Sequence, residues 1–227
     1  MKKIIALLVA MLAFASVSWG AVLTPAEKKE SATRAEAMYT VMDSFFRTNP
    51  VYQKKYSGKS GKEFAEKVAY YSMVYHLSRQ NFAELVGMMK KESSFRYDAR
   101  CGTSTARGAV QIIARYHPEL QKVGFKPILK KHKGRCKAGK KCTNFSHYSS
   151  VSYPGLVKNR DSSAKAAVYY YASLIKKHRD GTHLIWHTVG SPKSKANMDK
   201  FEKDFVQKAK WVQTVKECQE EVMSLLK

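Results

Sequence analysis

Apolar residues recur along most of the chain at the three- and four-residue spacing of one helix face, which predicts a mainly α fold. One such pattern starts at residues 24–27 (TPAE), a capping box with proline at the first helical position, and runs towards Asn49. The boxes at 60–63 and 81–84 predict the starts of two further helices. Ser162 is expected to cap a fourth.

The helical pattern breaks between residues 93 and 109, where Gly, Ser, Thr, Asp and Cys predict a loop with room for a small hairpin. Helical spacing returns briefly at 110–116, and residues 117–160 are rich in loop residues and lysine. A short helix is expected over 182–189, followed by an amphipathic helix within 193–227. No alternating strand pattern of useful length and no internal repeat is visible.

The first residues have the composition of an export signal. Two lysines precede an almost wholly apolar run, and small residues follow it at the usual cleavage positions near Gly20 and Ala21. That run is shorter than the roughly 18 apolar residues of a membrane span. We therefore predict an exported protein, periplasmic or secreted, without a transmembrane segment. Its expected organisation is a signal peptide (1–20), an N-terminal helical segment packed on the core (21–80), a core domain (81–192) with a basic, cysteine-containing insertion at about 117–160, and a C-terminal amphipathic helix (193–227).

Charge and cysteine content refine this prediction. The chain carries 41 Lys and Arg against 18 Asp and Glu, a formal net charge of +23, which attracts polyanions over long range. Of the four cysteines, Cys136 and Cys142 flank a short lysine- and glycine-rich loop, so a disulfide between them is favoured in an oxidising compartment, leaving Cys101 with Cys218. The alternative is a zinc site formed by Cys136, Cys142 and the two histidines that flank them, His132 and His147.

Glu92 stands out as a candidate acid because it falls at the C-terminal end of the third predicted helix. The helix dipole is negative there, and shielding by Met88, Met89 and Phe95 would desolvate the carboxyl group, so both effects would raise its pKa. The lysines at 90–91 are expected to face solvent. A carboxylic acid that stays protonated near neutral pH can protonate a glycosidic oxygen. By position alone, however, most glutamates at helix ends are solvated surface groups.

The residues around Glu92 change the interpretation. ESSF, followed by TARGAVQI, resembles the motifs of the lytic transglycosylases, a family of lysozyme-like enzymes. The family pattern runs Glu-Ser-x-Phe, then Asn-Pro-x-Ala, then Gly-Ala-x-Gly-Leu-Met-Gln. The matching positions here are Glu92, Ser93, Phe95, Ala99, Ala106, Gly108 and Gln111, with Val110 in the Met position and Thr105 in the first Gly position.

A third family signature, a helix followed by Ala-Tyr-Asn-Ala-Gly, is matched in part. The positions that fit are Ala167, Tyr170, Leu174, Ile175 and Gly190. WHTVG stands where Ala-Tyr-Asn-Ala-Gly is expected, so His187 replaces the tyrosine that lies beside the catalytic glutamate in the family, and Thr188 replaces the asparagine. A histidine can make a comparable hydrogen bond, but its charge varies with pH.

The resemblance implies a goose-type lysozyme-like helical domain that cleaves the β-1,4 bond between N-acetylmuramic acid and N-acetylglucosamine in peptidoglycan. Glu92 would be the catalytic acid and base, and the product would carry a 1,6-anhydro ring. No cofactor, metal or second carboxylate is implied, and Asp98 is expected to brace the loop. The substrate-binding residues would be Ser93, Phe95, Gln111, Tyr170, His187 and Thr188.

Three other functions remain open at this stage. The chain could be a peptidoglycan-binding or assembly protein weakened in activity at WHTVG, or a lysozyme-type hydrolase that uses water. Other envelope or secretion-machine proteins are conceivable partners. Nucleic-acid binding rests on charge alone, since no aromatic and basic motif of known spacing is present, and we do not expect it.

Overall fold

The computed structural model describes residues 22–102, 104–132, 145, 148–178, 183, 184, 187 and 205–227. Helices dominate this part of the chain, which confirms the mainly α prediction. The predicted signal peptide, Thr188 and the predicted Cys136–Cys142 disulfide, together with the alternative zinc site, lie outside the described residues. Among the helices that the structure describes, none is both long and apolar enough to cross a membrane.

Six α-helices and two small hairpins make up the described fold. The α-helices are α2 (Pro25–Arg47), α3 (Pro50–Tyr56), α4 (Gly58–Val74), α5 (Arg79–Ser93), α6 (Arg160–Lys177) and α9 (Phe205–Leu225). Short 3-10 helices are η2 (Ala114–Tyr116), η3 (Pro118–Val123) and η5 (Pro154–Val157). The antiparallel hairpins pair β1 (Ala106–Arg107) with β2 (Ile112–Ile113) and β3 (Ile128–His132) with β4 (Tyr148–Ser152).

Local capping decides where the helices begin. The predicted box at the start of α2 is present, with Thr24 and Glu27 each bonding the other's backbone. The predicted boxes at 60–63 and 81–84 are wrong, because α4 and α5 start earlier. For α5 the cap is Ser78, whose extended backbone lets its hydroxyl accept from the N–H of Asn81.

The starts of α4 and α6 also differ from the predicted ones, although Ser57 makes no side-chain capping bond. The backbone of Ser57 is extended before the first residue of α4, which places the predicted cap Ser60 inside the helix. At α6, the side chain of Asn159 accepts from the N–H of Ser162, so Asn159 is the cap and Ser162 lies within the first turn. In each case the residue just before the helix is a polar one, three positions upstream of the predicted cap.

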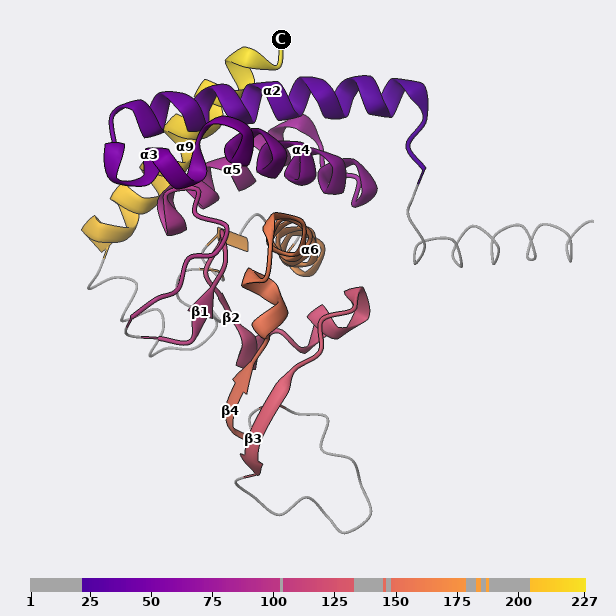
Figure 1. Cartoon of the computed structure of the whole chain (residues 1–227), viewed down its shortest axis with the longest axis vertical. Helices are drawn as coiled ribbons and strands as arrows, with labels where there is room; N and C mark the ends of the chain where they lie inside the picture. The colour runs from indigo at the N-terminus through magenta and orange to yellow at the C-terminus, as the bar shows by residue number, and fades with distance from the viewer. Residues whose placement is uncertain are drawn as a thin grey trace, which may run out of the picture.

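The helices pack in layers around one core. Figure 1 shows α2 near the top with the C-terminal end of α9 above it, α3, α4 and α5 below α2, α6 lower, and the two hairpins towards the lower end. α2 packs mainly on α4, α5 on α9, and α4 on α6. Buried side chains from all of these helices form a single hydrophobic cluster, which includes Met38, Phe46, Phe64, Phe82, Met88, Met89, Tyr171 and Val222.

α9 crosses α5 at very short range. A Cβ on Gly87 would lie 2.5 Å from the carbonyl oxygen of Val215, so only glycine permits the backbones to approach this closely. Cys218 and Val222 on the same face of α9 are fully buried. The helix at the end of the chain is thus an integral part of the fold that holds Glu92.

The burial of Cys218 corrects one prediction. Of the cysteines that the structure describes, Cys218 is a free thiol, so the predicted disulfide between Cys101 and Cys218 is not formed. Cys218 faces the core on α9, whereas Cys101 belongs to the loop before β1, where its N–H donates to the carbonyl of Ala106. Burial raises the pKa of the Cys218 thiol to about 12, as expected for an inert structural cysteine.

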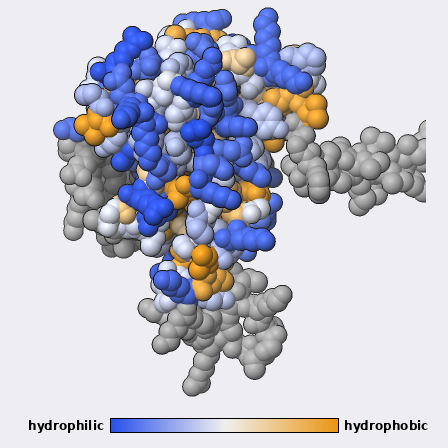
Figure 2. Space-filling view, in the orientation of Figure 1, coloured by the Kyte–Doolittle hydropathy of each residue, from blue (hydrophilic) through white to orange (hydrophobic). Residues whose placement is uncertain are grey.

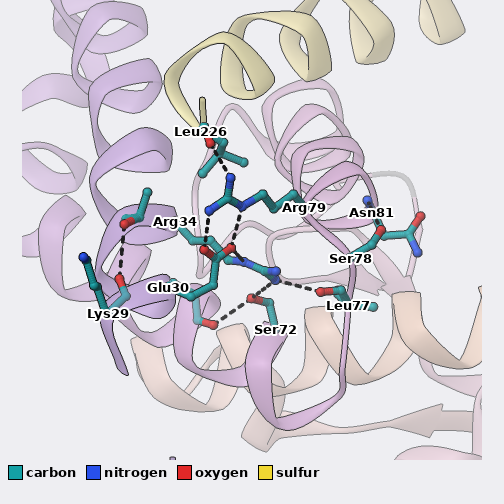
Figure 3. Close-up of polar contacts among 11 residues, drawn as sticks. Lys29, Glu30, Arg34, Ser72, Leu77, Ser78, Arg79, Asn81 and Leu226 are labelled. Atoms are coloured by element: carbon teal, nitrogen blue, oxygen red, sulfur yellow. Dashed lines mark hydrogen bonds and ion pairs between the residues drawn. The ribbon is translucent and has the colours of Figure 1, made fainter. Parts of the chain in front are cut away.

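A polar cluster binds the C-terminal end of α9, as Figure 3 shows. The guanidinium of Arg79 donates to both carboxylate oxygens of Glu30, at 3.0 and 2.6 Å, and to the carbonyl of Leu226 at 2.6 Å. Arg34 donates to the same carboxylate at 2.8 Å and to the hydroxyl of Ser72 at 3.0 Å. Residues from α2, α4 and α5 are thereby tied to the last turn of α9.

The β3–β4 hairpin projects from the helical body (Figure 1) and was missed by the hydrophobic pattern. Ile128 pairs with Ser152 and Leu129 with Val151. Ile128 and Leu129 are 51% and 37% exposed, and Figure 2 shows apolar surface at this lower end of an otherwise mostly hydrophilic face. Neighbouring apolar residues on both faces of a strand give no alternation of apolar and polar positions, which explains why the sequence pattern did not predict this hairpin.

Candidate active site

Glu92 lies in the last turn of α5, as predicted. The helix ends at Ser93 because Ser94 adopts the left-handed conformation, with φ 54° and ψ 45°, and Phe95 follows with φ 60°. The carboxylate side chain is 22% exposed, so it keeps a small open face while most of it is enclosed. A glutamate held at a rigid helix end, partly shielded from water, has the placement that acid–base chemistry needs.

Three segments far apart in the sequence meet at this carboxylate. The indole Nε1 of Trp211, on α9, donates to Glu92 Oε1 at 2.7 Å. The imidazole Nε2 of His187 lies 3.4 Å from the same oxygen. On the other side of the ring, His187 Nδ1 is 2.8 Å from the hydroxyl of Tyr170 on α6. The histidine therefore connects Tyr170 with Glu92.

The polar chain continues beyond Tyr170. The ring of His117 packs edge-on against that of Tyr170, with centroids 4.6 Å apart. His117 Nδ1 in turn lies 2.9 Å from Glu119 Oε1. Burial raises the pKa of the Tyr170 hydroxyl far above its ordinary value, so Tyr170 stays neutral beside His187.

The charge state of Glu92 differs from the one predicted. Burial does raise the pKa of the carboxyl group, but the hydrogen bond and charge of His187, followed by the Trp211 N–H and a small contribution from exposed Lys91, together lower the pKa below its ordinary value. The prediction of a raised pKa is therefore wrong for the free protein. It considered the helix end and apolar neighbours, but not the charge of His187, which the family pattern had placed beside the glutamate, nor Trp211, which no motif marks.

A second histidine–glutamate pair lies next to the first. His183 Nε2 is 2.6 Å from Glu84 Oε1, and the hydroxyl of Tyr171 donates to the same oxygen. His183 and His187 are four residues apart in the sequence, and Glu84 and Glu92 both belong to α5. The two pairs together hold the histidine-bearing segment against α5.

Two of the predicted substrate contacts are buried instead. Ser93 is 2% exposed and its hydroxyl donates to the carbonyl of Met89, while Phe95 is fully buried with its ring edge-on to Phe45. Both residues pack the turn that ends α5 behind Glu92. This placement corrects their predicted role from substrate binding to support of the glutamate.

Tyr170 is also a supporting residue, since it is 4% exposed and its hydroxyl bonds to His187. Gln111 lies in the β1–β2 turn with φ 51°, half-buried, and its side-chain amide donates to the carbonyl of Gly108 at 2.9 Å. Asp98 accepts from the hydroxyl of Tyr56 at 2.6 Å and from Lys55 at 2.7 Å. The predicted role of Asp98 as a loop brace is thus what the structure shows.

A separate surface hollow of about 510 Å³ opens between α4 and the start of α6. Its charged groups pair with one another: Arg160 with Glu63, and Lys67 with Asp161. Glu92 is not among its lining residues, which are Glu63, Glu66, Lys67, Tyr97, Asp98, Val157, Lys158, Asn159, Arg160 and Asp161. The candidate acid thus belongs to a different part of the surface.

Trp211 and the Glu84–His183 pair are the site residues that sequence reasoning missed. No motif marks Trp211, since it lies on a helix outside the region of family resemblance. Within the part of the chain that the structure describes, no group of three or more His, Cys, Asp or Glu residues is arranged to hold a metal ion.

Comparisons with protein-family models, curated proteins and solved structures found no match.

Proposed function

We propose that this protein is a peptidoglycan lytic transglycosylase with a lysozyme-like fold and Glu92 as its single general acid and base. The observation that carries the proposal is the convergence of His187 and Trp211 on one oxygen of a mostly enclosed carboxylate at the end of α5. The motif residues around Glu92 support the choice of the lytic transglycosylase family, and the mainly helical architecture is compatible with that family.

The reaction needs Glu92 first as an acid. Protonation of the glycosidic oxygen breaks the bond to N-acetylglucosamine, and the resulting carboxylate then takes the proton of the sugar's own C6 hydroxyl. The C6 oxygen attacks C1 and closes the 1,6-anhydro ring, so that no water is consumed. One carboxylate serves both steps, in contrast to the pair found in most glycosidases.

His187 accounts for the proton that a low-pKa glutamate lacks. In the free protein the pair is a carboxylate beside a ring that can carry a proton on both nitrogens, and we propose that Nδ1–H donates to the Tyr170 oxygen, 2.8 Å away. Transfer of the Nε2 proton to Glu92 makes both groups neutral without changing their total charge. A bound glycan excludes water and penalises the charged form, which favours this transfer.

Tyr170 selects which nitrogen exchanges the proton. In this proposed scheme its oxygen accepts from Nδ1–H both before and after the transfer, so Nε2 is the nitrogen left to face Glu92. The replacement of the family's tyrosine by His187 thereby becomes part of the mechanism. Gln111 and Thr188 remain the proposed contacts to the glycan, and Ser93, Phe95 and Tyr170 act as support.

The surface and the predicted export suit this substrate. Lys126 and Lys130 are exposed on and beside the projecting hairpin, and peptidoglycan peptides carry free carboxylates that lysines attract. We propose that the mature protein acts in the periplasm or outside the cell on glycan strands. Other envelope or secretion-machine proteins are proposed partners, whereas a cofactor or nucleic acid is not.

Mass analysis of the fragments released from purified peptidoglycan by the mature protein tests the proposal. Fragments with 1,6-anhydromuramic acid are expected, and their release should require Glu92. Reducing-end fragments, heavier by one water, would identify a lysozyme-type hydrolase. Binding without release would identify a wall-binding or assembly protein, the alternative favoured by the unusual residues His187 and Thr188.

A further inference from the structure

We infer that Trp211 is a positioning residue for Glu92, so that the site is incomplete without the indole that α9 supplies. The inference rests on the proposed role of Glu92 as the acid and base. It concerns a residue outside the motifs that first indicated the site. The contact joins residues 119 positions apart, at a distance of 2.7 Å between Trp211 Nε1 and Glu92 Oε1.

The chemistry of the indole makes this contact directional. Trp211 has one N–H and no acceptor, so it can only donate, and it binds the carboxylate through an oxygen that keeps its lone pairs. His187 approaches the same oxygen, Oε1. None of the described residues donates a hydrogen bond to Oε2. The two partners therefore converge on Oε1.

The indole also constrains the histidine. The rings of Trp211 and His187 lie with centroids 5.8 Å apart at an angle of 35°, so Trp211 contacts both members of the proton-sharing pair. Trp211 is itself half-buried. One side chain thus fixes the carboxylate oxygen and limits the movement of the ring that exchanges a proton with it.

The position of Trp211 is set by the way α9 packs. Four residues beyond Trp211, Val215 meets Gly87 at a distance that excludes any Cβ, and Cys218 lies buried one turn further on. The carbonyl of Leu226 is held by Arg79 at the other end of the helix. Because both the middle and the end of α9 are fixed on α5, the position of the indole beside Glu92 is set by the packing of the helix.

Other charged and titratable groups also face Glu92. Lys91 lies next to it on α5, His187 approaches from its own segment, and the neutral hydroxyl of Tyr170 lies behind the histidine on α6. His187 and Lys91 favour the carboxylate by charge, whereas Trp211 favours it through a hydrogen bond alone. Loss of the N–H is therefore expected to raise the pKa of Glu92 without removing a charge.

The pH profile of peptidoglycan cleavage tests this inference with Trp211→Phe, which removes the N–H and keeps an aromatic ring. The limb of kcat/KM that titrates with Glu92 is expected to move to higher pH by about one unit, the size of a hydrogen bond to a charged group. Gln213→Ala, an exposed change on the same helix, should leave the limb in place. An unmoved limb in folded Trp211→Phe would overturn the inference.

A spectroscopic measurement gives a readout that needs no activity. The indole N–H signal of Trp211, identified by its absence in Trp211→Phe, should shift as pH falls and Glu92 gains a proton. This titration should disappear in Glu92→Gln. If the signal titrates with Glu92 but no fragments are released, the inference stands and the proposed function fails. If fragments are released but the indole signal does not shift as Glu92 titrates, the inference fails and the function stands.

Discussion

The hydroxyl of Tyr170 lies 2.8 Å from Nδ1 of His187, whose Nε2 is 3.4 Å from Glu92 Oε1. One imidazole thus joins a neutral phenol to a carboxylate. The side chain of His187 is only 6% exposed, so a ring N–H that lost its partner would find little water to replace it. The Tyr170–His187 contact is therefore expected to control how readily the ring keeps the proton that it shares with Glu92.

Tyr170→Phe should lower cleavage activity by about tenfold at neutral pH. The change removes the oxygen that accepts from Nδ1–H, and leaving a buried donor unsatisfied costs about 1–3 kcal/mol. Tyr171→Phe is the matched control, because the neighbouring hydroxyl bonds to Glu84 instead. Initial rates of fragment release from both variants make the comparison, and equal losses would contradict a specific role for Tyr170.

His187→Gln should shift the pH optimum of cleavage to lower pH. Without His187, burial is the dominant remaining influence and raises the pKa of Glu92. No histidine then supplies the proton, so activity is lost as soon as pH rises above the pKa of Glu92 itself. Activity at neutral pH is expected to fall by about a hundredfold, in the range for loss of one proton-transfer partner. Complete pH–rate profiles of the variant and the wild type provide the measurement.

His183→Gln is the control for that experiment. This histidine pairs with Glu84 at 2.6 Å and contacts the same helix, α5, but it does not touch Glu92. Its loss should reduce stability and leave the pH optimum unchanged. If both histidine variants shift the optimum equally, the effect comes from loosening of the segment and not from the shared proton.

Gly87→Ala should destabilise the protein by about 1–3 kcal/mol. The added Cβ would meet the backbone oxygen of Val215, and this overpacking outweighs the gain in helix propensity of up to about 1 kcal/mol. Gly102→Ala, where nothing lies within 4 Å of the new atom, should change stability by less than about 0.5 kcal/mol. Urea unfolding compares the two, and a neutral Gly87→Ala would contradict the close crossing of α5 and α9.

Glu30→Gln should reduce stability by about 1–2 kcal/mol at neutral pH, less than the full pKa shift implies because solvent screens the pair. Arg79, assisted by Arg34, lowers the pKa of Glu30 to about 2. Because the folded pKa lies below the unfolded value, this stabilisation is complete above about pH 4.5 and disappears as pH falls towards 2. The difference from wild type in unfolding free energy should shrink over that range.

Asp43→Asn serves as the control for Glu30. Its ion pair with Arg47 lies within one helix, and the arginine is 75% exposed. Such a surface pair contributes less than about 1 kcal/mol. A Glu30→Gln variant that is no less stable than Asp43→Asn at neutral pH would show that the cluster at the end of α9 contributes little.

Local patterns predicted the helices well, and the family pattern indicated His187 as a neighbour of Glu92, but nothing in the sequence indicated Trp211. The box at Thr24 and Glu27 was identified correctly because its bonds join residues three apart, and Glu92 was placed correctly at the end of its helix. The starts of α4 and α5 were misplaced because each helix begins after a serine with extended backbone three residues before the predicted cap, and at α5 that serine, Ser78, also accepts a backbone hydrogen bond. Short-range signals identify a helix more reliably than its first residue.

Long-range contacts explain the remaining errors. The indole of Trp211 reaches Glu92 only because α9 folds back across Gly87, and no feature near either residue marks that crossing. The pKa of Glu92 is lowered by the same distant partners. The Cys101–Cys218 pairing was inferred by elimination, whereas the packing of α9 buries Cys218 in the core.

The rate of anhydro-fragment release by Glu92→Gln, compared with Glu84→Gln, tests the central claim most directly. Both glutamates lie on α5 and accept hydrogen bonds from other segments, but only Glu92 is proposed to transfer a proton to the glycan. Glu92→Gln should lose about a thousandfold in rate, within the range for general acid–base catalysis, while folded Glu84→Gln keeps most of its activity. Full activity in Glu92→Gln, or equal losses in the two variants, would contradict the assignment of Glu92 as the acid and base.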